Sequence, residues 1–417
     1  MPARSQAETR KLFRGGTHRT VAPADTLARV RPLMAEMGIT RIANVTGLDF
    51  IGIPVVMVTR PNSRSIAVAQ GKGLELDAAM ASGLMESVET YHAERIDLPL
   101  KLTSFEELRR QHRVIDLERL PPLAESAFHP KLPLLWIEGQ DLIQDEALWL
   151  PYELVHTNFT LPYPPGSGCF MASSNGLASG NHRLEAITHA ITEVVERDAT
   201  ALWDCSFPKD PDTGRLDLES VDDPYCRELL ERYRKAGIAV AVWDATTDIG
   251  LPAMECWIME KATGASPVAR SSRGSGCHVA REVALSRALT EAAQDRLSVI
   301  SGARDDLLEE DYALAGDAEL QRKREAIFVE GATPRRFQDV PSLQRETLED
   351  DLAWALERLQ AVGIEEVAVV DLTKPGRFDI PVLRVVIPGL EGVPDHPGYR
   401  PGPRAEAALA ALGEAAP

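Results

Sequence analysis

One uninterrupted stretch rich in carboxylates, residues 185–198, constrains the fold of this chain more than any other. It reads Glu-Ala-Ile-Thr-His-Ala-Ile-Thr-Glu-Val-Val-Glu-Arg-Asp, without Gly or Pro, and Ser179 or Asn181 just before it can cap a helix. At about 100° per residue, its polar side chains share one stripe, while its aliphatic residues lie largely elsewhere and can face a core. The stripe holds Glu185, His189, Glu193 and Glu196.

The simplest interpretation of such a stripe is a solvent-facing surface. Like charges three or four residues apart disfavour a helix by about 0.2–0.5 kcal/mol per pair, which a solvated face tolerates. Two further predicted helices, at residues 76–95 and 279–301, repeat the pattern. The second stripe holds Ser82, Glu86 and Glu89, and the third holds Arg287, Glu291 and Gln294. This recurrence favours a shared function over three unrelated surfaces.

Both of these further helices follow a glycine-rich segment, which we predict to be a turn before the first and a loop before the second. The segments are Gln70-Gly-Lys-Gly73 and residues 271–278, Ser-Ser-Arg-Gly-Ser-Gly-Cys-His. A glycine-rich turn that opens a helix exposes backbone N–H groups and suits an anion. Neither segment is a Walker A loop, which requires Gly-x-x-x-x-Gly-Lys-Ser/Thr.

The remaining pattern alternates strands and helices throughout the chain. Helices are predicted at residues 23–37 and 222–236, and a charged, helical, peripheral region at 308–362. Strands are predicted at residues 41–45, 54–59, 65–69, 134–138, 147–150, 238–244, 253–259, 367–371 and 382–387, the fourth and fifth forming a hairpin. The pattern predicts a mixed α/β (α+β) class, with mixed sheets flanked by helices. We expect an N-terminal arm, helix and first strands (1–61), a catalytic core (62–392) and a C-terminal tail (393–417).

Composition narrows the classes of function. The chain has 417 residues and a formal net charge of −18, which argues against bulk binding to nucleic acid or to an anionic membrane. No apolar run approaches the ~20 residues that span a bilayer, and the N-terminus has no hydrophobic region, so we expect a cytoplasmic protein. The five cysteines are scattered without a Cys-x-x-Cys pair, which favours neither a disulfide framework nor a thiolate zinc site.

If the three stripes converge, five glutamates share one cavity. Two carboxylates about 4 Å apart repel by about 4 kcal/mol at an effective dielectric of about 20, so cations or protons must neutralise them. Oxygen ligands select Mg²⁺ or Ca²⁺ over zinc, and Mg²⁺ commonly bridges carboxylates to phosphates. Nearby basic groups then favour a nucleoside triphosphate as the ligand. These groups are Arg197, Arg287 and the N-terminal arm that carries Lys11 and Arg19.

Other interpretations stay open at this point. The basic arm can be an irregular surface segment, and His189 can be a hydrogen-bonding helix residue or a proton carrier. The stripes also suit a metal-dependent hydrolase with paired carboxylates, or a nucleotide-binding scaffold without catalysis of its own. Spacing alone defines the stripes but not their convergence.

Three motifs summarise these stripes: Ser82-x3-Glu86-x2-Glu89, Glu193-x2-Glu196-Arg197 and Arg287-x3-Glu291-x2-Gln294. Their order and spacing resemble the three ATP–Mg²⁺ motifs of the YcaO family. The resemblance runs from about Lys11 to Gly392 and includes residues 46–54, 70–73 and 301–306. It implies a YcaO-type ATP-binding fold without a Walker loop.

The resemblance also implies a reaction. YcaO enzymes activate a peptide backbone amide: a nucleophile adds to the carbonyl, ATP phosphorylates the oxygen, and phosphate leaves. A Cys, Ser or Thr nucleophile gives an azoline, whereas external sulfide gives a thioamide. The implied Mg²⁺ ligands are Glu86, Glu89, Glu193, Glu196 and Glu291, and the implied nucleotide contacts are Ser82, Arg197, Arg287, Gln294, Lys11 and Arg19. We assign Glu193, Glu196 and His189 to catalysis.

The C-terminal sequence favours one of these products. Azoline-forming members commonly end in Pro-x-Pro-x-Pro, whereas this chain ends Leu412-Gly-Glu-Ala-Ala-Pro417. Its segments Val385-Val-Ile-Pro-Gly-Leu-Glu391 and Pro401-Gly-Pro-Arg404 look more like members paired with a TfuA protein, a subgroup associated with thioamide installation. We therefore expect thioamidation of a peptide or protein, with a TfuA-like partner and a separate sulfur donor. A homodimer is compatible with the resemblance.

Overall fold

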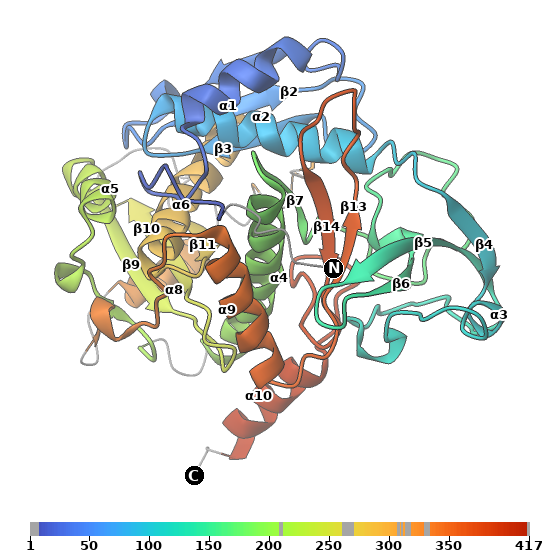
Figure 1. Cartoon of the computed structure of the whole chain (residues 1–417). Helices are drawn as coiled ribbons and strands as arrows, with labels where there is room; N and C mark the ends of the chain where they lie inside the picture. The colour runs from blue at the N-terminus through green and yellow to red at the C-terminus, as the bar shows by residue number, and fades with distance from the viewer. Residues whose placement is uncertain are drawn as a thin grey trace.

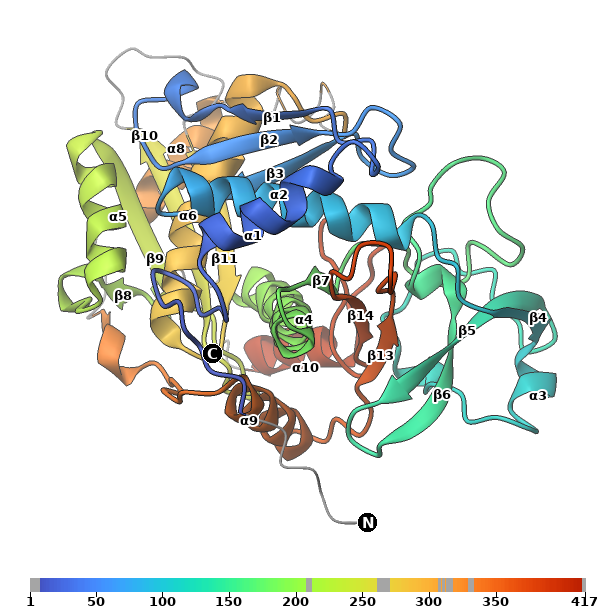
Figure 2. The same ribbon diagram turned by 45° about the horizontal axis from the view of Figure 1, so that its top comes forward.

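The computed structural model describes residues 8–207, 212–260, 271–306, 309, 312, 318–328 and 334–414. It is organised around helix α4 (Arg183–Ser206), which extends beyond the predicted segment at both ends. Figure 2 looks nearly along α4 and shows it below α2 (Leu76–Ala93), between β11 (Ser271–Cys277) and β14 (Val382–Val386). The central helix of the sequence is thus also central in space.

The start of α4 differs from the predicted cap. His182 is the N-cap, and its side chain accepts a hydrogen bond from a backbone N–H of the first turn. Ser179 instead donates through N and Oγ to Glu89, and the side-chain amide of Asn181 donates to Thr26 Oγ1 at 2.9 Å. Both predicted caps are therefore occupied by contacts with segments distant in sequence.

Two copies of one architecture lie beside α4. In each copy, three antiparallel strands are followed by a helix that packs on the third strand. The first copy comprises β1 (Arg41–Asn44), β2 (Val55–Thr59), β3 (Val68–Lys72) and α2. The second comprises β9 (Ile238–Asp244), β10 (Ala253–Glu260), β11 and α6 (Arg281–Ser301). The polar stripes thus lie on α4 and on the closing helix of each copy (Figure 1).

The glycine-rich segments before α2 and α6 are largely strand, which corrects their prediction as a turn and a loop. A Cβ added at Gly71 in β3 would lie 2.0 Å from the carbonyl oxygen of Ala79, and one at Gly276 in β11 would lie 2.2 Å from that of Ala284. Glycine in a strand often marks a close approach of another backbone. Here it allows α2 and α6 to lie directly against the strands that precede them.

A six-stranded sheet lies on the other side of α4. Its order is β4 (Leu100–Ser104), β5 (Pro133–Asp141), β13 (Ala368–Asp371), β14 and β7 (Leu177–Ser179), and β6 (Glu146–Pro151) also pairs with β5. The β5–β6 pair is the predicted hairpin. Two short strands, β8 (Leu216–Asp217) and β12 (Arg335–Arg336), form a separate parallel pair. The architecture confirms the predicted mixed α/β class.

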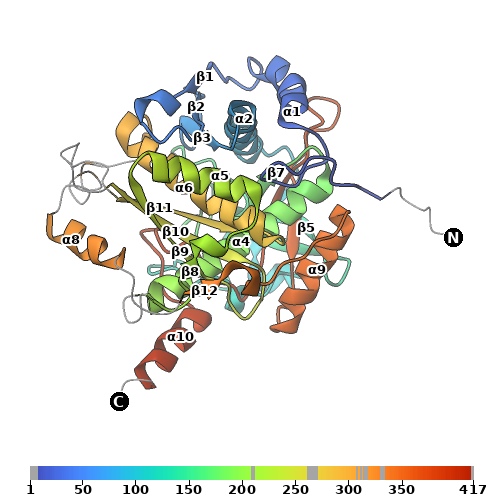
Figure 3. The same ribbon diagram turned by 90° about the vertical axis from the view of Figure 1, so that its left-hand side faces the viewer.

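The remaining helices cover these layers. They are α1 (Pro23–Val30), α3 (Phe105–Leu108), α5 (Pro224–Lys235), α8 (Ala318–Ile327), α9 (Leu348–Ala361) and α10 (Pro403–Glu414). Figure 3 shows α10 leaving the body of the protein at the end opposite to α1 and α2. The region predicted to be peripheral contains α9, which packs on α4 and buries Leu348, Ala355 and Leu359. That prediction is wrong for α9, and part of the region lies outside the described residues.

The core is formed on the apolar side of α4. Ile187, Ile191 and Val194 join a hydrophobic cluster with β14 residues Leu383 and Val385. With this side against the large sheet, the polar stripe of α4 is left to face the two strand–helix copies. No helix in the described part of the chain is both long and apolar enough to cross a membrane. The boundaries expected after residues 61 and 392 stay predictions.

Candidate functional site

The three polar stripes converge on one chamber between α2, α4 and α6. Ser275 Oγ on β11 connects two of them, because it lies 3.3 Å from Oε1 of both Glu196 and Glu291. The α2 stripe lies beside them. Burial raises the pKa of Glu86 and Glu89 on α2, and the nearby charge of Glu193 on α4 raises both further. The structure thus brings together the five glutamates that spacing alone could not place.

The two α2 carboxylates favour protonation near neutral pH. Burial raises the pKa of Glu86 to about 7, although Arg304 counteracts it. Burial raises the pKa of Glu89 to about 8, although Ser179 donates to Glu89 Oε1 through N at 2.8 Å and Oγ at 2.7 Å. Burial also raises the pKa of Glu193. A bound cation favours the ionised form of such carboxylates, so protons and cations compete for them.

Glu291 has the opposite character. Burial raises its pKa, but Lys72 and Arg197 outweigh burial and hold that pKa well below the usual range. The Lys72 Nζ atom lies 2.5 Å from Glu291 Oε2. Lys72 lies outside the three polar stripes and was not predicted as a site residue, although its position between two glycines before α2 was a signal in the sequence.

Glu196 is the most buried of the five carboxylates, with a side chain 2% exposed. Its Oε2 accepts a hydrogen bond from Cys277 N at 2.8 Å, and Arg287 Nη2 lies 3.6 Å from the same oxygen. Arg197 Nη2 lies 3.8 Å from its Oε1. Arg197 and Arg287 are 31% and 21% exposed through their side chains, so both guanidinium groups remain partly open to a ligand.

His189 lies beside one of these guanidinium groups. Its Nδ1 is 3.3 Å from Arg287 Nη1, and a guanidinium has no acceptor, so Nδ1 accepts the hydrogen bond. Burial, Arg287 and Arg19 hold the pKa of His189 well below its usual value. A cavity of about 10 Å³ is lined by these three side chains among others. A neutral imidazole in this position orients Arg287.

The N-terminal arm brings one of its two predicted donors to the chamber. Burial lowers the pKa of Arg19, while Glu185 raises it, so Arg19 is within electrostatic reach of α4. Thr20 Oγ1 donates to Glu185 at 2.6 Å, and this stripe residue therefore fastens the arm. Lys11 differs from the prediction: its Nζ lies 2.8 Å from Asp351 on α9, and both side chains are buried. Lys11 thus holds the arm against α9 through a buried ion pair, and its contact with a nucleotide stays a prediction.

Two predicted nucleotide contacts and one unpredicted cation complete the chamber. Gln294 donates through Nε2 to Gln70 Oε1 at 3.1 Å, while its own Oε1 is buried without a partner among the described residues. Ser82 is exposed on α2, one helical turn before Glu86. Arg304 follows α6 and was not predicted as a site residue. Its charge lowers the pKa of Glu86, whereas burial raises that pKa.

The chemistry of this donor set fits Mg²⁺. The available ligands are carboxylates, which Mg²⁺ prefers over nitrogen or sulfur donors. In the described part of the chain, no group of three or more His, Cys, Asp or Glu side chains could hold a metal by itself. Mg²⁺ usually keeps several waters and combines one or two carboxylates with phosphate oxygens. The chamber therefore suits Mg²⁺ that binds together with a phosphate-bearing ligand.

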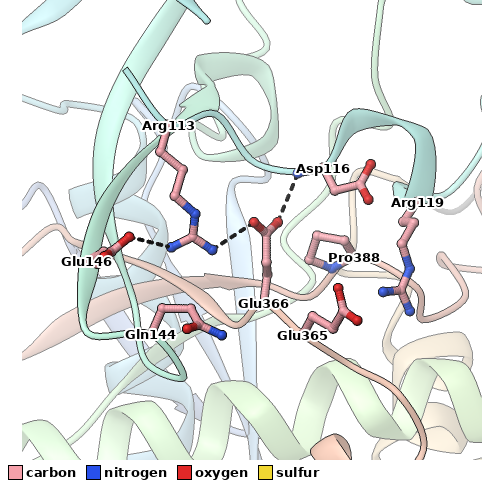
Figure 4. A pocket seen from close by; sticks show the side chains of 8 residues that line it. All are labelled: Arg113, Asp116, Arg119, Gln144, Glu146, Glu365, Glu366 and Pro388. Atoms are coloured by element: carbon pink, nitrogen blue, oxygen red, sulfur yellow. Dashed lines mark hydrogen bonds and ion pairs between the residues drawn. The ribbon is translucent and has the colours of Figure 1, made fainter. Parts of the chain in front are cut away.

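A separate cavity of about 260 Å³ does not involve the stripes. It is lined by Arg113, Asp116, Arg119, Gln144, Glu146, Glu365, Glu366 and Pro388. Figure 4 shows that Arg113 lies between Glu146 and Glu366, and Glu366 also accepts a hydrogen bond from Asp116 N. Four of the residues that line this cavity are acidic, and Arg113 pairs with two of them, so the cavity contains few charges that suit a nucleotide.

Comparison with known proteins identifies the family. A family model described as YcaO cyclodehydratase, ATP- and Mg²⁺-binding, matches residues 70–391. The chain belongs to the YcaO family. ATP and Mg²⁺ are therefore the cofactors of this YcaO protein, which confirms that prediction.

Individual relatives of this YcaO protein cover most of the chain. A Rhizobium leguminosarum bv. trifolii protein, encoded in the 3′ region of tfuA, is 38% identical over 379 residues, covering 89% of this chain and 88% of that protein. The structure of YcaO from Methanopyrus kandleri bound with AMPPCP and Mg²⁺ has a TM-score of 0.72 at 22% identity, covering 95% of this chain and 98% of that one. A heterocyclase in complex with substrate and cofactor has a TM-score of 0.75 at 23% identity, covering 93% of this chain and 54% of its own. This chain spans about half of that heterocyclase, and both structures show the shared fold.

Proposed function

We propose that this YcaO protein uses ATP to activate a backbone amide of a peptide or protein and installs a thioamide there. The observation that carries the proposal is the meeting of three acidic stripes with the cations Lys72, Arg197 and Arg287 in one chamber. Carboxylates can hold Mg²⁺ on one side of a triphosphate, while fixed cations stabilise the charge on the other. The Methanopyrus kandleri YcaO bound with AMPPCP and Mg²⁺ supports the same class of ligand.

Roles for individual residues follow from their places in the chamber. The proposed Mg²⁺ ligands are Glu86, Glu89, Glu193, Glu196 and Glu291. The proposed nucleotide contacts are Arg19, Lys72, Ser82, Arg197, Arg287 and Gln294. His189 positions Arg287 and does not carry a proton in this proposal.

The reaction needs little covalent help from the protein. An amide oxygen is a poor leaving group, and ATP supplies the phosphoryl group that converts it into a good one. The chain then has to align the amide oxygen with that phosphoryl group and neutralise the charge that develops. Cations from β3, α4 and α6 surround the carboxylates and can serve this purpose.

The choice of thioamide over azoline rests on a relative. The protein encoded beside tfuA is 38% identical to this chain, which supports a TfuA-like partner. A thioamide product would in addition require a separate sulfur donor. The family description and the heterocyclase structure favour the alternative, an azoline-forming cyclodehydratase of Cys, Ser or Thr residues. Mass spectrometry of a co-expressed substrate peptide separates them, because exchange of oxygen for sulfur raises the peptide mass and loss of water lowers it.

Release of ADP tests amide activation itself. The Glu193→Gln variant should lose peptide-dependent ADP release and keep its fold, because a neutral amide lacks the negative charge that a carboxylate ligand supplies to Mg²⁺. Glu357→Gln, an exposed glutamate on α9, is the matched control and should keep wild-type turnover. Unchanged turnover in Glu193→Gln rejects the metal role. ATP binding without peptide-dependent turnover in the wild type indicates a scaffold, and metal-dependent turnover without ATP indicates a hydrolase.

A further inference from the structure

Arg384 on β14 is a buried guanidinium without an ionic partner. The residue is 2% exposed, and its Nη2 donates to the carbonyl oxygen of Ser173 at 2.8 Å. Its Nε and Nη1 atoms have no hydrogen-bond partner among the described residues. Burial lowers the pKa of Arg384 to about 10, so the side chain stays charged at neutral pH. The fold therefore buries a positive charge whose hydrogen-bonding capacity is mostly unused.

A second buried arginine shows what a structural role looks like in this chain. Arg60 is also 2% exposed, and its Nη1 and Nη2 atoms each lie 2.6 Å from an oxygen of Glu94. Thr90 and Ser63 accept further hydrogen bonds from Arg60. A buried charge is tolerated when it is paired in this way, and is costly when it is not. Arg384 therefore needs a partner that the folded chain itself does not supply.

The side chain of His156 provides a further donor within electrostatic reach of Arg384. The Nδ1 atom of His156 accepts from Asn158 N at 3.1 Å, so its proton is on Nε2, which is buried without an acceptor among the described residues. Burial, together with a smaller effect of Arg384, lowers the pKa of His156 to about 4, so the two side chains are in electrostatic reach. These groups offer hydrogen-bond donors to an oxygen that carries negative charge.

The donors lie next to the carboxylate chamber. Residues 173–176 connect them, because Ser173 accepts from Arg384 while Gly176 N donates to Glu193 Oε1 at 3.4 Å. The backbone of Val385, beside Arg384, also donates to the carbonyl oxygen of Gly176 at 2.8 Å. Burial lowers the pKa of Arg384, and the nearby carboxylate of Glu193 raises it. The strand that carries Arg384, β14, lies with β7 on one side of α4, and α6 lies on the other side (Figure 2).

We propose that Arg384, assisted by His156, forms an oxyanion site that receives the carbonyl oxygen of the peptide amide. This inference rests on the proposed function. When a sulfide nucleophile adds, its electron pair forms the C–S bond and the C=O π pair moves to the oxygen, which Arg384 then stabilises. The oxyanion next forms a bond to the γ-phosphorus of ATP as the bond from that phosphorus to ADP breaks. Donors fixed in a water-poor site are suited to charge that develops during reaction.

Stability measurements separate this role from a structural one. Arg384→Met removes an unpaired buried charge and should raise the Tm of the full chain. Arg60→Met is the matched variant and should lower the Tm, because it leaves Glu94 buried without its partner. A fall in Tm for Arg384→Met comparable to that of Arg60→Met would show that Arg384 is paired in the fold, and would overturn the proposal.

Turnover measurements complete the test. In Arg384→Met, the kcat of peptide-dependent ADP release should fall about 100- to 1000-fold, as when an oxyanion donor is removed, while the Kd for AMPPCP with Mg²⁺ stays within about twofold. Wild-type kcat in Arg384→Met overturns the proposal.

A readout without peptide distinguishes this proposal from the proposed function. Crystals of the full chain with AMPPCP and Mg²⁺ are soaked in sodium bromide, and anomalous density is measured at the Arg384 guanidinium. We expect a bromide peak in the wild type and none in Arg384→Met. An ordered water that bromide does not replace would overturn the oxyanion site. A bromide peak in a wild type that shows no peptide-dependent turnover would keep the oxyanion site and reject the proposed function.

Discussion

The Lys72 ammonium and the Glu291 carboxylate lie 2.5 Å apart and join the last strand of the first strand–helix copy to the closing helix of the second. Their side chains are 19% and 23% exposed, so the pair faces the chamber and not the core. Lys72 neutralises Glu291 when no cation is bound. In the proposed function, Glu291 would hold Mg²⁺ in place of Lys72, and Lys72 would then be available to a phosphate oxygen.

Replacing Lys72 by Met should therefore weaken nucleotide binding. A hydrogen bond to a charged group contributes about 1.5–3 kcal/mol, which predicts a loss of about 10- to 100-fold in affinity for AMPPCP with Mg²⁺. Isothermal titration calorimetry measures this change. Lys235→Met, at a lysine whose side chain is 71% exposed on α5, is the control and should bind as the wild type does. Equal affinities for both variants would remove Lys72 from the site.

Binding of Mg²⁺ and nucleotide should release protons at neutral pH. The pKa of Glu86 is raised to about 7 and that of Glu89 to about 8, so both are largely protonated below these values and must ionise to hold Mg²⁺. Affinity should thus rise with pH between about 6 and about 9. Calorimetric titration in buffers with different ionisation enthalpies counts the released protons. Affinity and proton count that do not change with pH would contradict the raised pKa values.

His189 should act through Arg287 and not as a proton carrier. In His189→Asn, a side-chain oxygen can still accept from Arg287, so nucleotide affinity should stay near that of the wild type. In His189→Leu, this acceptor is lost, and affinity should fall about tenfold. Because the pKa of His189 is held well below its usual value, neither variant should remove a limb of the pH–rate profile. A limb lost in His189→Asn would restore the proton-carrier hypothesis.

Lys11 should matter for stability more than for nucleotide binding. Lys11→Met leaves Asp351 buried without its partner, which predicts a loss of about 3–5 kcal/mol in the free energy of unfolding. Replacing Asp351 by Leu in the same chain should recover part of that loss. Chemical denaturation measures both. Unaltered stability together with a weakened Kd for AMPPCP would show that Lys11 contacts the nucleotide after all.

Features that depend on local geometry could be predicted from the sequence, whereas features that depend on contacts between distant residues could not. A helical period assigns Glu193 and Glu196 to one stripe, because the period depends only on local geometry. The same reasoning could not pair Lys11 with Asp351, which lies 340 residues away. It also could not show that Gly71 and Gly276 belong to strands, because glycine is rare in strands and its use here depends on a helix packed against it.

The same distinction applies to the candidate site, of which only some residues could be predicted from the sequence. Spacing and family resemblance indicated the acidic stripes together with Arg197 and Arg287, whereas two further cations come from single positions outside any periodic pattern. Lys72 ends a strand, and Arg304 follows a helix. Arg384 is flanked by apolar residues in β14, and nothing in the neighbouring sequence explains a charged residue there. Such residues become recognisable only when tertiary contacts show what surrounds them.

The position of the metal tests the central claim most directly. A crystal structure of the full chain with AMPPCP and Mn²⁺, used for its anomalous signal in place of Mg²⁺, locates the ions. We expect anomalous peaks between α2, α4 and α6, within about 2.2 Å of carboxylate oxygens from Glu86 or Glu89, from Glu193 or Glu196, and from Glu291, and bridged to the phosphates. Peaks or nucleotide located elsewhere, with these carboxylates contacting only water or protein, would contradict the account.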